Sequence, residues 1–128
     1  MMKSVDLDNI ILFHNKIIQQ TGGSHGLRDR NLVESALNKA YVSYDGKDLY
    51  PTVEEKIAAI TYSLIQNHGF VDGNKRIGIA IMLLLLKLNN IQIKYTQQEL
   101  IDLGLGTAAG EYKQINILHW IKDRKHFD

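Results

Sequence analysis

Residues 68–76 read His-Gly-Phe-Val-Asp-Gly-Asn-Lys-Arg, and this stretch decides the fold because helical patterns flank it on both sides. Before it, Thr52 and Glu55 form a capping-box pattern that opens an amphipathic helix. After it, a strongly apolar helix is expected from Asn74 to about Leu88. A loop that enters a helix N-terminus presents unpaired backbone N–H groups and the positive end of the helix dipole. This arrangement predicts an anion site that suits a phosphate.

The side chains of the loop favour nucleotide chemistry. Asp72 can hold the divalent cation that accompanies a nucleoside triphosphate, and Lys75 and Arg76 can neutralise its oxygens. His68 can take a proton near neutral pH, and its spacing from Leu64 places it on the inward face of the preceding helix. Each residue alone also fits a turn, a solvated helix start or a capping histidine. The whole set in this order indicates a nucleotide-using transferase site.

Four further helices are indicated by capping residues and apolar spacing. Asp6 and Asp29 can cap helices that run to about residues 20 and 40. Thr96 with Glu99 repeats the capping-box pattern for a fifth helix. A last helix is expected from about Tyr112 to Arg124. Its buried residues should be Ile115, Leu118 and Ile121.

The composition is that of one soluble globular domain. The 128 residues are 45% hydrophobic and 23% charged, which is enough apolar content for a real core. A net charge of +1 argues against a nucleic-acid partner, and the lack of cysteine fits a cytoplasmic protein. The N-terminus is unlike a signal peptide, and the apolar run at 77–86 is too short to cross a membrane. We predict a compact all-α bundle of about six helices, forming a single domain over residues 1–128.

The stretch at 68–76 resembles the motif of the Fic/Doc superfamily, His-x-Phe-x-Asp/Glu-Gly-Asn-Gly-Arg, and within it the death-on-curing (Doc) toxin branch. That branch has a lysine in place of the second glycine, and Lys75 stands at this position. Three shorter segments look like Doc landmarks: residues 26–29 (Gly-Leu-Arg-Asp), 49–51 (Leu-Tyr-Pro) and 107–111 (Thr-Ala-Ala-Gly-Glu). The resemblance covers nearly all of the chain and implies the helical Fic/Doc fold.

The resemblance also implies a role for each motif residue. His68 would deprotonate a hydroxyl on a target protein, Phe70 would anchor the loop in the core, and Asp72 would bind Mg²⁺ with the nucleotide. Lys75 would act in catalysis beside His68 and Asp72. The phosphate-binding group would be Gly73, Asn74, Lys75 and Arg76.

Position 75 separates two chemistries. A glycine lets a phosphate approach the backbone, whereas Lys75 fills that space and adds a charge. In the Doc branch a lysine here goes with ATP bound in the opposite orientation, so that the γ-phosphate lies where Fic enzymes place the α-phosphate. The resemblance therefore implies a kinase that transfers the γ-phosphate to a threonine of elongation factor Tu and thereby stops translation. Ile79 points the same way, because Fic enzymes carry an arginine there. The alternatives are a Fic-type AMP transferase and a non-catalytic module that binds an antitoxin or a nucleotide.

A Doc-type toxin is expected to be restrained from outside. Thr107 and Glu111 match the start of the inhibitory Ser/Thr-x-x-x-Glu-Gly/Asn motif of many Fic proteins, but Tyr112 breaks it. We interpret the segment as a helix junction and leave open an inhibitory role for Glu111. The resemblance implies a type II toxin–antitoxin pair, in which a short antitoxin places its C-terminal helix in a groove beside the site.

Residues 41–50 allow two interpretations, a docking flap and an ordinary surface loop. Residues 41–50 contain Asp45-Gly46, which is typical of a hairpin turn, and they correspond to the family's flap for the target segment. The sequence alone favours the alternative, an ordinary surface loop.

No structural metal is expected, because ligand spacing such as His-Glu-x-x-His is lacking at His14, His25, His119 and His126.

Overall fold

A computed structural model describes residues 2–125. Its elements, in chain order, are α1 (Leu7–Thr21), α2 (Arg30–Asn38), η1 (Lys39–Tyr41), β1 (Ser43–Tyr44), β2 (Lys47–Asp48), α3 (Val53–Asn67), α4 (Asn74–Leu88), α5 (Gln97–Ala108) and α6 (Gln114–Asp123). The predicted all-α class is confirmed, because the only sheet in the described residues is the two-stranded β1–β2 pair. No helix in this part of the chain has both the length and the apolar character needed to cross a membrane.

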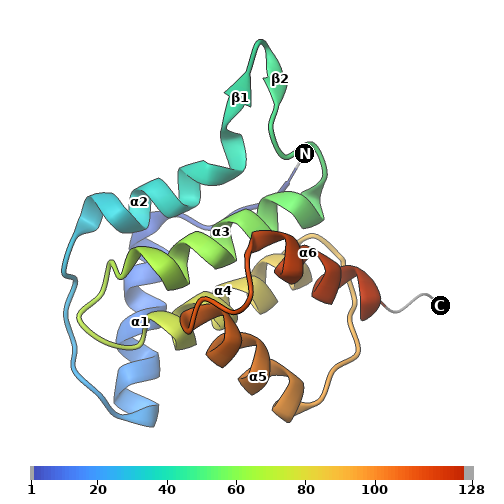
Figure 1. Ribbon diagram of the computed structural model, residues 1–128. Helices are drawn as coiled ribbons and strands as arrows, with labels where there is room; N and C mark the ends of the chain where they lie inside the picture. The colour runs from blue at the N-terminus through green and yellow to red at the C-terminus, as the bar shows by residue number, and fades with distance from the viewer. Residues whose placement is uncertain (1, 126–128) are drawn as a thin grey trace.

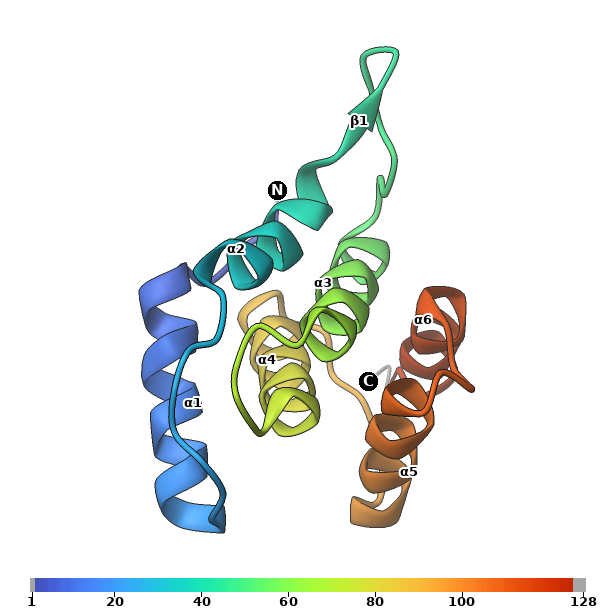
Figure 2. The same ribbon diagram turned by 60° about the vertical axis from the view of Figure 1, so that its left-hand side comes forward.

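Helix α4 is the centre of the fold. Helix α3 packs along it, while α1 lies on one side and α5 on another (Figure 1, Figure 2). Partly buried apolar residues (Ile79, Leu83 and Leu84) cover one side of this helix, and the opposite broad face carries its buried residues. They include Ile77, Ile81, Met82, Leu85 and Leu86. The N-terminus of this central helix therefore has a fixed position, and the motif loop leads directly into it.

Capping residues fix most helix starts as the sequence predicts. Asp6 and Asp29 accept main-chain N–H bonds at the starts of α1 and α2, and Thr96 with Glu99 forms a complete capping box. At α3, Thr52 accepts the bond from the N–H of Glu55 but donates its own hydroxyl to the Glu55 carboxylate, so the box is only half formed. Helix α2 ends earlier than predicted and tightens into the 3₁₀ turn η1.

The last helix differs from the sequence prediction. Helix α6 begins at Gln114 because the Asn116 side chain accepts the N–H of Lys113 (2.7 Å) and sets the start there. The predicted burial of Ile115 is wrong, since its side chain is 53% exposed, and Leu118 is only partly buried. The face that packs on the core carries Ile117, Trp120 and Ile121.

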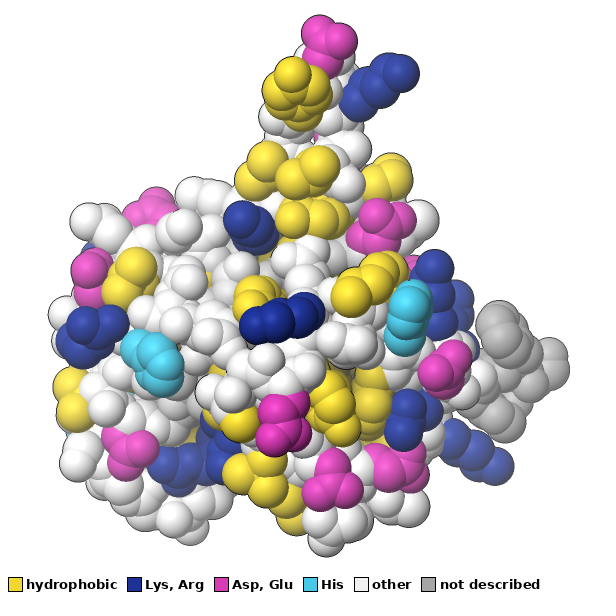
Figure 3. Space-filling view, in the orientation of Figure 1, with side chains coloured by type: hydrophobic (Ala, Val, Ile, Leu, Met, Phe, Trp, Pro, Cys, Tyr) yellow, Lys and Arg dark blue, Asp and Glu magenta, His cyan; other side chains and the backbone are white. Residues whose placement is uncertain are grey.

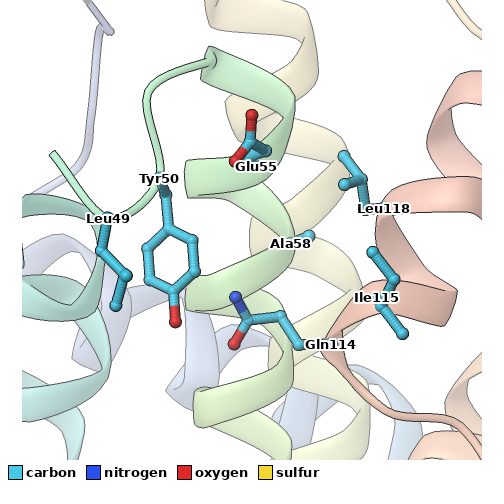
Figure 4. A pocket seen from close by; sticks show the side chains of 7 residues that line it. All are labelled: Leu49, Tyr50, Glu55, Ala58, Gln114, Ile115 and Leu118. Atoms are coloured by element: carbon cyan, nitrogen blue, oxygen red, sulfur yellow. The ribbon is translucent and has the colours of Figure 1, made fainter.

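The turn indicated by Asp45-Gly46 forms part of a short hairpin that stands away from the helical body. Its turn residues Asp45 (φ 53°) and Gly46 (φ 74°) both have the positive φ that a tight two-residue hairpin turn needs. Figure 3 shows hydrophobic side chains on this projection and around its base, and Tyr44 of β1 is 81% exposed. Below it, a pocket of about 300 Å³ separates the hairpin base from α6 (Figure 4). The pocket is lined by Leu49, Tyr50, Glu55, Ala58, Gln114, Ile115 and Leu118.

A buried lysine ties the hairpin to α3. The ammonium group of Lys56 donates to the carbonyls of Ala40 and Tyr50 and to the carboxylate of Asp48, at 3.1, 2.5 and 3.3 Å. An ammonium group has three N–H donors, so all three are used. Since Ala40 precedes β1 while Asp48 and Tyr50 lie on the returning arm, Lys56 holds both arms of the projection.

Candidate active site

His68 ends α3 in a left-handed conformation (φ 51°, ψ 50°) and is exposed. The prediction that it lies on the inward face of that helix is therefore wrong, because the chain turns at His68 itself. The carbonyls at this helix end are satisfied by Arg28, whose guanidinium donates to His68 O (2.7 Å) and Asn67 O (3.3 Å). The turn presents the imidazole to solvent while its backbone stays fixed.

Gly69 is required for close packing and not for a positive φ. A Cβ at this position would collide with the side chain of Val33 in α2. The Gly69 carbonyl accepts the N–H groups of Arg28 (2.8 Å) and Asp29 (2.9 Å), and Val71 N–H donates to Gly26 O (3.0 Å). The 26–29 segment, noted in the sequence as a landmark, is thus the backbone partner of the motif loop.

Phe70 and Asn74 build the inside of the loop. The Phe70 side chain is buried, as its expected anchoring role requires. The amide of Asn74 accepts the Phe70 N–H (3.0 Å) and donates to the Phe70 carbonyl (2.9 Å). Both polar atoms of this buried side chain are engaged in closing the loop. The second N–H of its side-chain amide and its main-chain N–H are the donors left for the phosphate contact predicted at position 74.

Asp72 is held as a carboxylate at the mouth of the loop. Its oxygens accept the N–H groups of Ser24 (3.1 Å) and Gly73 (2.7 Å), and Arg76 lies 3.6 Å away. The two main-chain bonds, followed by the charge of Arg76, lower the pKa of Asp72 below its ordinary value of 3.8. The side chain is 45% exposed, so the ionised oxygens remain accessible to a cation.

The motif residues meet in one pocket at the N-terminus of α4. The helix starts after Gly73 (φ 76°), which supplies no side-chain cap, so the first N–H groups of α4 depend on partners outside the helix. The pocket measures about 350 Å³. It is lined by Ile65, His68, Val71, Asp72, Gly73, Asn74, Lys75, Arg76 and Ala108. A base, a carboxylate, two cations and a helix N-terminus therefore share one cavity.

Sequence comparison agrees with this geometry. The profile of the Fic/DOC family matches residues 4–86. The chain belongs to the Fic/Doc family. It is 31% identical to "Protein kinase doc" of Escherichia phage P1 over 113 residues, which is 86% of each protein. It is 38% identical to "Toxin Doc" of Mycolicibacterium smegmatis over 72 residues, which spans 56% of this chain and 55% of that relative.

The Fic/Doc site depends on residues that sequence reasoning did not assign to it. Arg76 donates to the hydroxyl of Thr21 (2.6 Å) and to the carbonyl of Gly22 (2.8 Å), so the end of α1 holds this cation in place. Ser24 holds Asp72, and His14 bonds to the loop backbone. His14 lies four residues after Ile10 and four before Ile18, a spacing typical of a buried helix face that gives no sign of this contact. Thr21 and Ser24 gave no signal in the sequence.

Asp72 should contribute to the dependence of stability on pH. Because its folded-state pKa is lowered, its stabilising effect is present above about pH 3.8 and is lost as the pH falls through the folded-state value. We expect the free energy of unfolding to fall less between about pH 6 and about pH 3 in Asp72→Asn than in the wild type. Urea denaturation at the two pH values measures this. An identical loss in both proteins would contradict the contribution of Asp72.

Proposed function

We propose that this protein is a Doc-type toxin that transfers the γ-phosphate of ATP to a hydroxyl of a protein target. The observation that carries the proposal is the single pocket that joins His68, Asp72, Lys75 and the open N-terminus of α4. The names of the two relatives support the toxin and kinase assignments. By resemblance to the family, the first target to examine is a threonine of elongation factor Tu.

The chemistry follows from the side chains of the pocket. The neutral ring of His68 would take the proton of the target hydroxyl, and the resulting oxygen would attack the γ-phosphorus. The bond from that phosphorus to the β–γ bridging oxygen breaks, and ADP leaves with the electron pair. Lys75 and Arg76 would offset the charge on the phosphate oxygens. The exposure of His68 at the protein surface suits a hydroxyl carried by another protein.

The donor set fits Mg²⁺. This cation prefers oxygen ligands and is commonly bound by one or two carboxylates together with substrate phosphates and water. Asp72 provides an ionised and accessible carboxylate. Residues 2–125 contain no group of three or more His, Cys, Asp or Glu side chains that could hold a metal ion. The remaining ligands would come from the nucleotide and water, and the ion would neutralise phosphate charge.

A groove beside the pocket suits an antitoxin helix. It measures about 490 Å³ and lies between α1, α4 and α5, with a largely apolar lining that includes Ile17, Leu83, Leu100 and Ile101. Lys75 and Arg76 line both this groove and the site pocket. A partner helix with an apolar face and an acidic end would therefore cover the groove and reach the two cations of the site.

The hairpin is the proposed docking element for the target. Strands β1 and β2 pair only with each other in the described part of the chain, so their outer edges are open to an added strand. Lys56 keeps this projection at a fixed place relative to α3, the helix that ends at His68. The docking element and the proposed base are thus carried by the same helix.

Growth arrest tests the toxin assignment. Expression of this chain alone in a bacterium should stop growth and incorporation of labelled methionine into protein. Co-expression of a cognate antitoxin, sought first as a short reading frame beside the gene, should restore growth. The groove variant Ile101→Glu should stay toxic but lose rescue, because a charge there opposes apolar docking.

The matched control is Leu12→Glu, which places the same charge on an exposed leucine of α1 that does not line the groove. This variant should be toxic and rescued like the wild type. High-level expression of soluble wild-type protein without any effect on growth would count strongly against the toxin assignment.

A further inference from the structure

We propose that His14 is a positioning residue for Asp72, through which α1 controls the binding of metal-bound nucleotide. The inference rests on the proposed function, because it takes Asp72 as the carboxylate that meets the cation. His14 belongs to α1 and lies more than fifty residues before the motif. It is nevertheless in direct contact with the backbone of the loop.

The contact is buried and specific. The His14 side chain is 1% exposed, and its Nε2 lies 2.6 Å from the carbonyl oxygen of Asp72. A carbonyl can only accept, so the bond requires a proton on Nε2 of His14. The imidazole also stacks on the ring of Phe70, with centroids 3.9 Å apart and planes 12° from parallel. One side chain thus holds two residues of the loop.

The bond fixes the end of the loop that carries the carboxylate. Asn74 pins the loop at Phe70 from the side of α4, as described above. His14 pins it at Asp72 from the side of α1. With its backbone held, Asp72 can reach the N–H groups of Ser24 and Gly73 while its oxygens stay accessible. Without the His14 bond, the Asp72 carbonyl loses its buried partner, and the peptide group that follows Asp72 is less restrained.

Loss of this bond should therefore weaken the binding of a metal–nucleotide complex more than the binding of nucleotide alone. Partners that orient a metal ligand from behind typically change metal affinity by about 10- to 100-fold when they are removed. The phosphate contacts proposed for the α4 N-terminus, Lys75 and Arg76 would not involve the His14 ring, which does not line the pocket. They should persist when the metal is absent.

The test uses the full chain with Mn²⁺ as the probe for the cation. His14→Phe keeps a ring that can stack on Phe70 but has no donor, and His14→Gln keeps an N–H donor. The matched control is His119→Phe, the same exchange at an exposed histidine of α6. Isothermal titration calorimetry measures ATP binding with Mn²⁺ and with EDTA, and electron paramagnetic resonance counts bound Mn²⁺ independently of activity.

We expect His14→Phe to weaken Mn²⁺–ATP binding by about tenfold or more and His14→Gln by only about threefold. Binding in EDTA should stay within about twofold for every variant, and His119→Phe should match the wild type. If His14→Phe binds Mn²⁺–ATP as the wild type does, the inference is wrong. If the wild type itself binds no Mn²⁺–ATP, the proposed function fails, and the role of His14 fails with it.

A second measurement covers the case in which His14→Phe does not fold. Nitrogen-15 NMR of the wild type should show a proton on Nε2 of His14, with slow exchange of that proton because the ring is buried. A proton on Nδ1 with a bare Nε2 would overturn the inference, since the bond to Asp72 could not exist.

Discussion

His68→Asn is expected to abolish growth arrest and to lower phosphoryl transfer by about 100- to 10,000-fold, the range in which a positioned general base contributes. Asparagine tolerates the left-handed backbone at this position, which alanine adopts with strain, and it cannot take a proton near neutral pH. The contact from Arg28 goes to the main-chain carbonyl of residue 68 and survives the exchange. The variant therefore removes the chemistry and keeps the turn.

The measurements are toxicity at matched expression and the unfolding temperature of the purified protein. His68→Ala should be as inactive as His68→Asn. Its free energy of unfolding should be about 1 kcal/mol lower than that of His68→Asn, because alanine is unfavourable in the left-handed conformation of residue 68. His25→Asn, at another exposed histidine outside the pocket lining, serves as the control and should remain toxic. Equal toxicity of His68→Asn and the wild type would remove His68 from the mechanism.

The helices were predictable because their signals are local. The side chains of Asp6, Asp29 and Thr96 each accept a bond at the helix start that the sequence indicates. The motif loop was likewise predictable from residue types alone, since a glycine before a helix with adjacent charges favours an anion site. What these signals cannot give is the direction in which a side chain points after a turn.

The features of the site that the sequence did not predict all depend on a turn or on a distant contact. A period of four residues placed His68 inside, but the left-handed turn at that residue moved it to the surface. The phosphate role of Asn74 stays a prediction, but the closing of the loop by its amide around Phe70 was not foreseen. The contact between His14 and Asp72 joins α1 to the loop across 58 positions, which no local pattern encodes.

The burial prediction for α6 was right for Ile121 but wrong for Ile115, for a related reason. A helical period alone does not say which of two adjacent apolar stripes faces the core. The stripe with Ile117 and Ile121 packs inward, while Ile115 and Leu118 line the pocket at the hairpin base. That choice depends on where the hairpin lies, and the sequence shows only its turn.

Label from γ-labelled ATP should be transferred to a protein in a bacterial translation extract with Mg²⁺, and label from α-labelled ATP should not. The reason lies at two positions of α4. The side-chain stem of Lys75 runs beside Gly104 of α5, where an added Cβ would come within 3.0 Å of it. By resemblance to the family, Lys75 stands where Fic enzymes carry a glycine that admits a phosphate close to the backbone. Ile79 lines the apolar groove and offers no charge to a second phosphate.

Both features disfavour seating the triphosphate with its α-phosphate at His68, so the γ-phosphate should lie there instead. Lys75→Ala should lower transfer by about 100-fold, because it removes a cation from the transition state without restoring an arginine at position 79. Lys87→Ala, at the exposed far end of the same helix, should leave transfer unchanged. The modified target, with elongation factor Tu examined first, should gain the mass of one phosphate. If the label followed the α-phosphate instead, the kinase proposal would fail and AMP transfer would replace it.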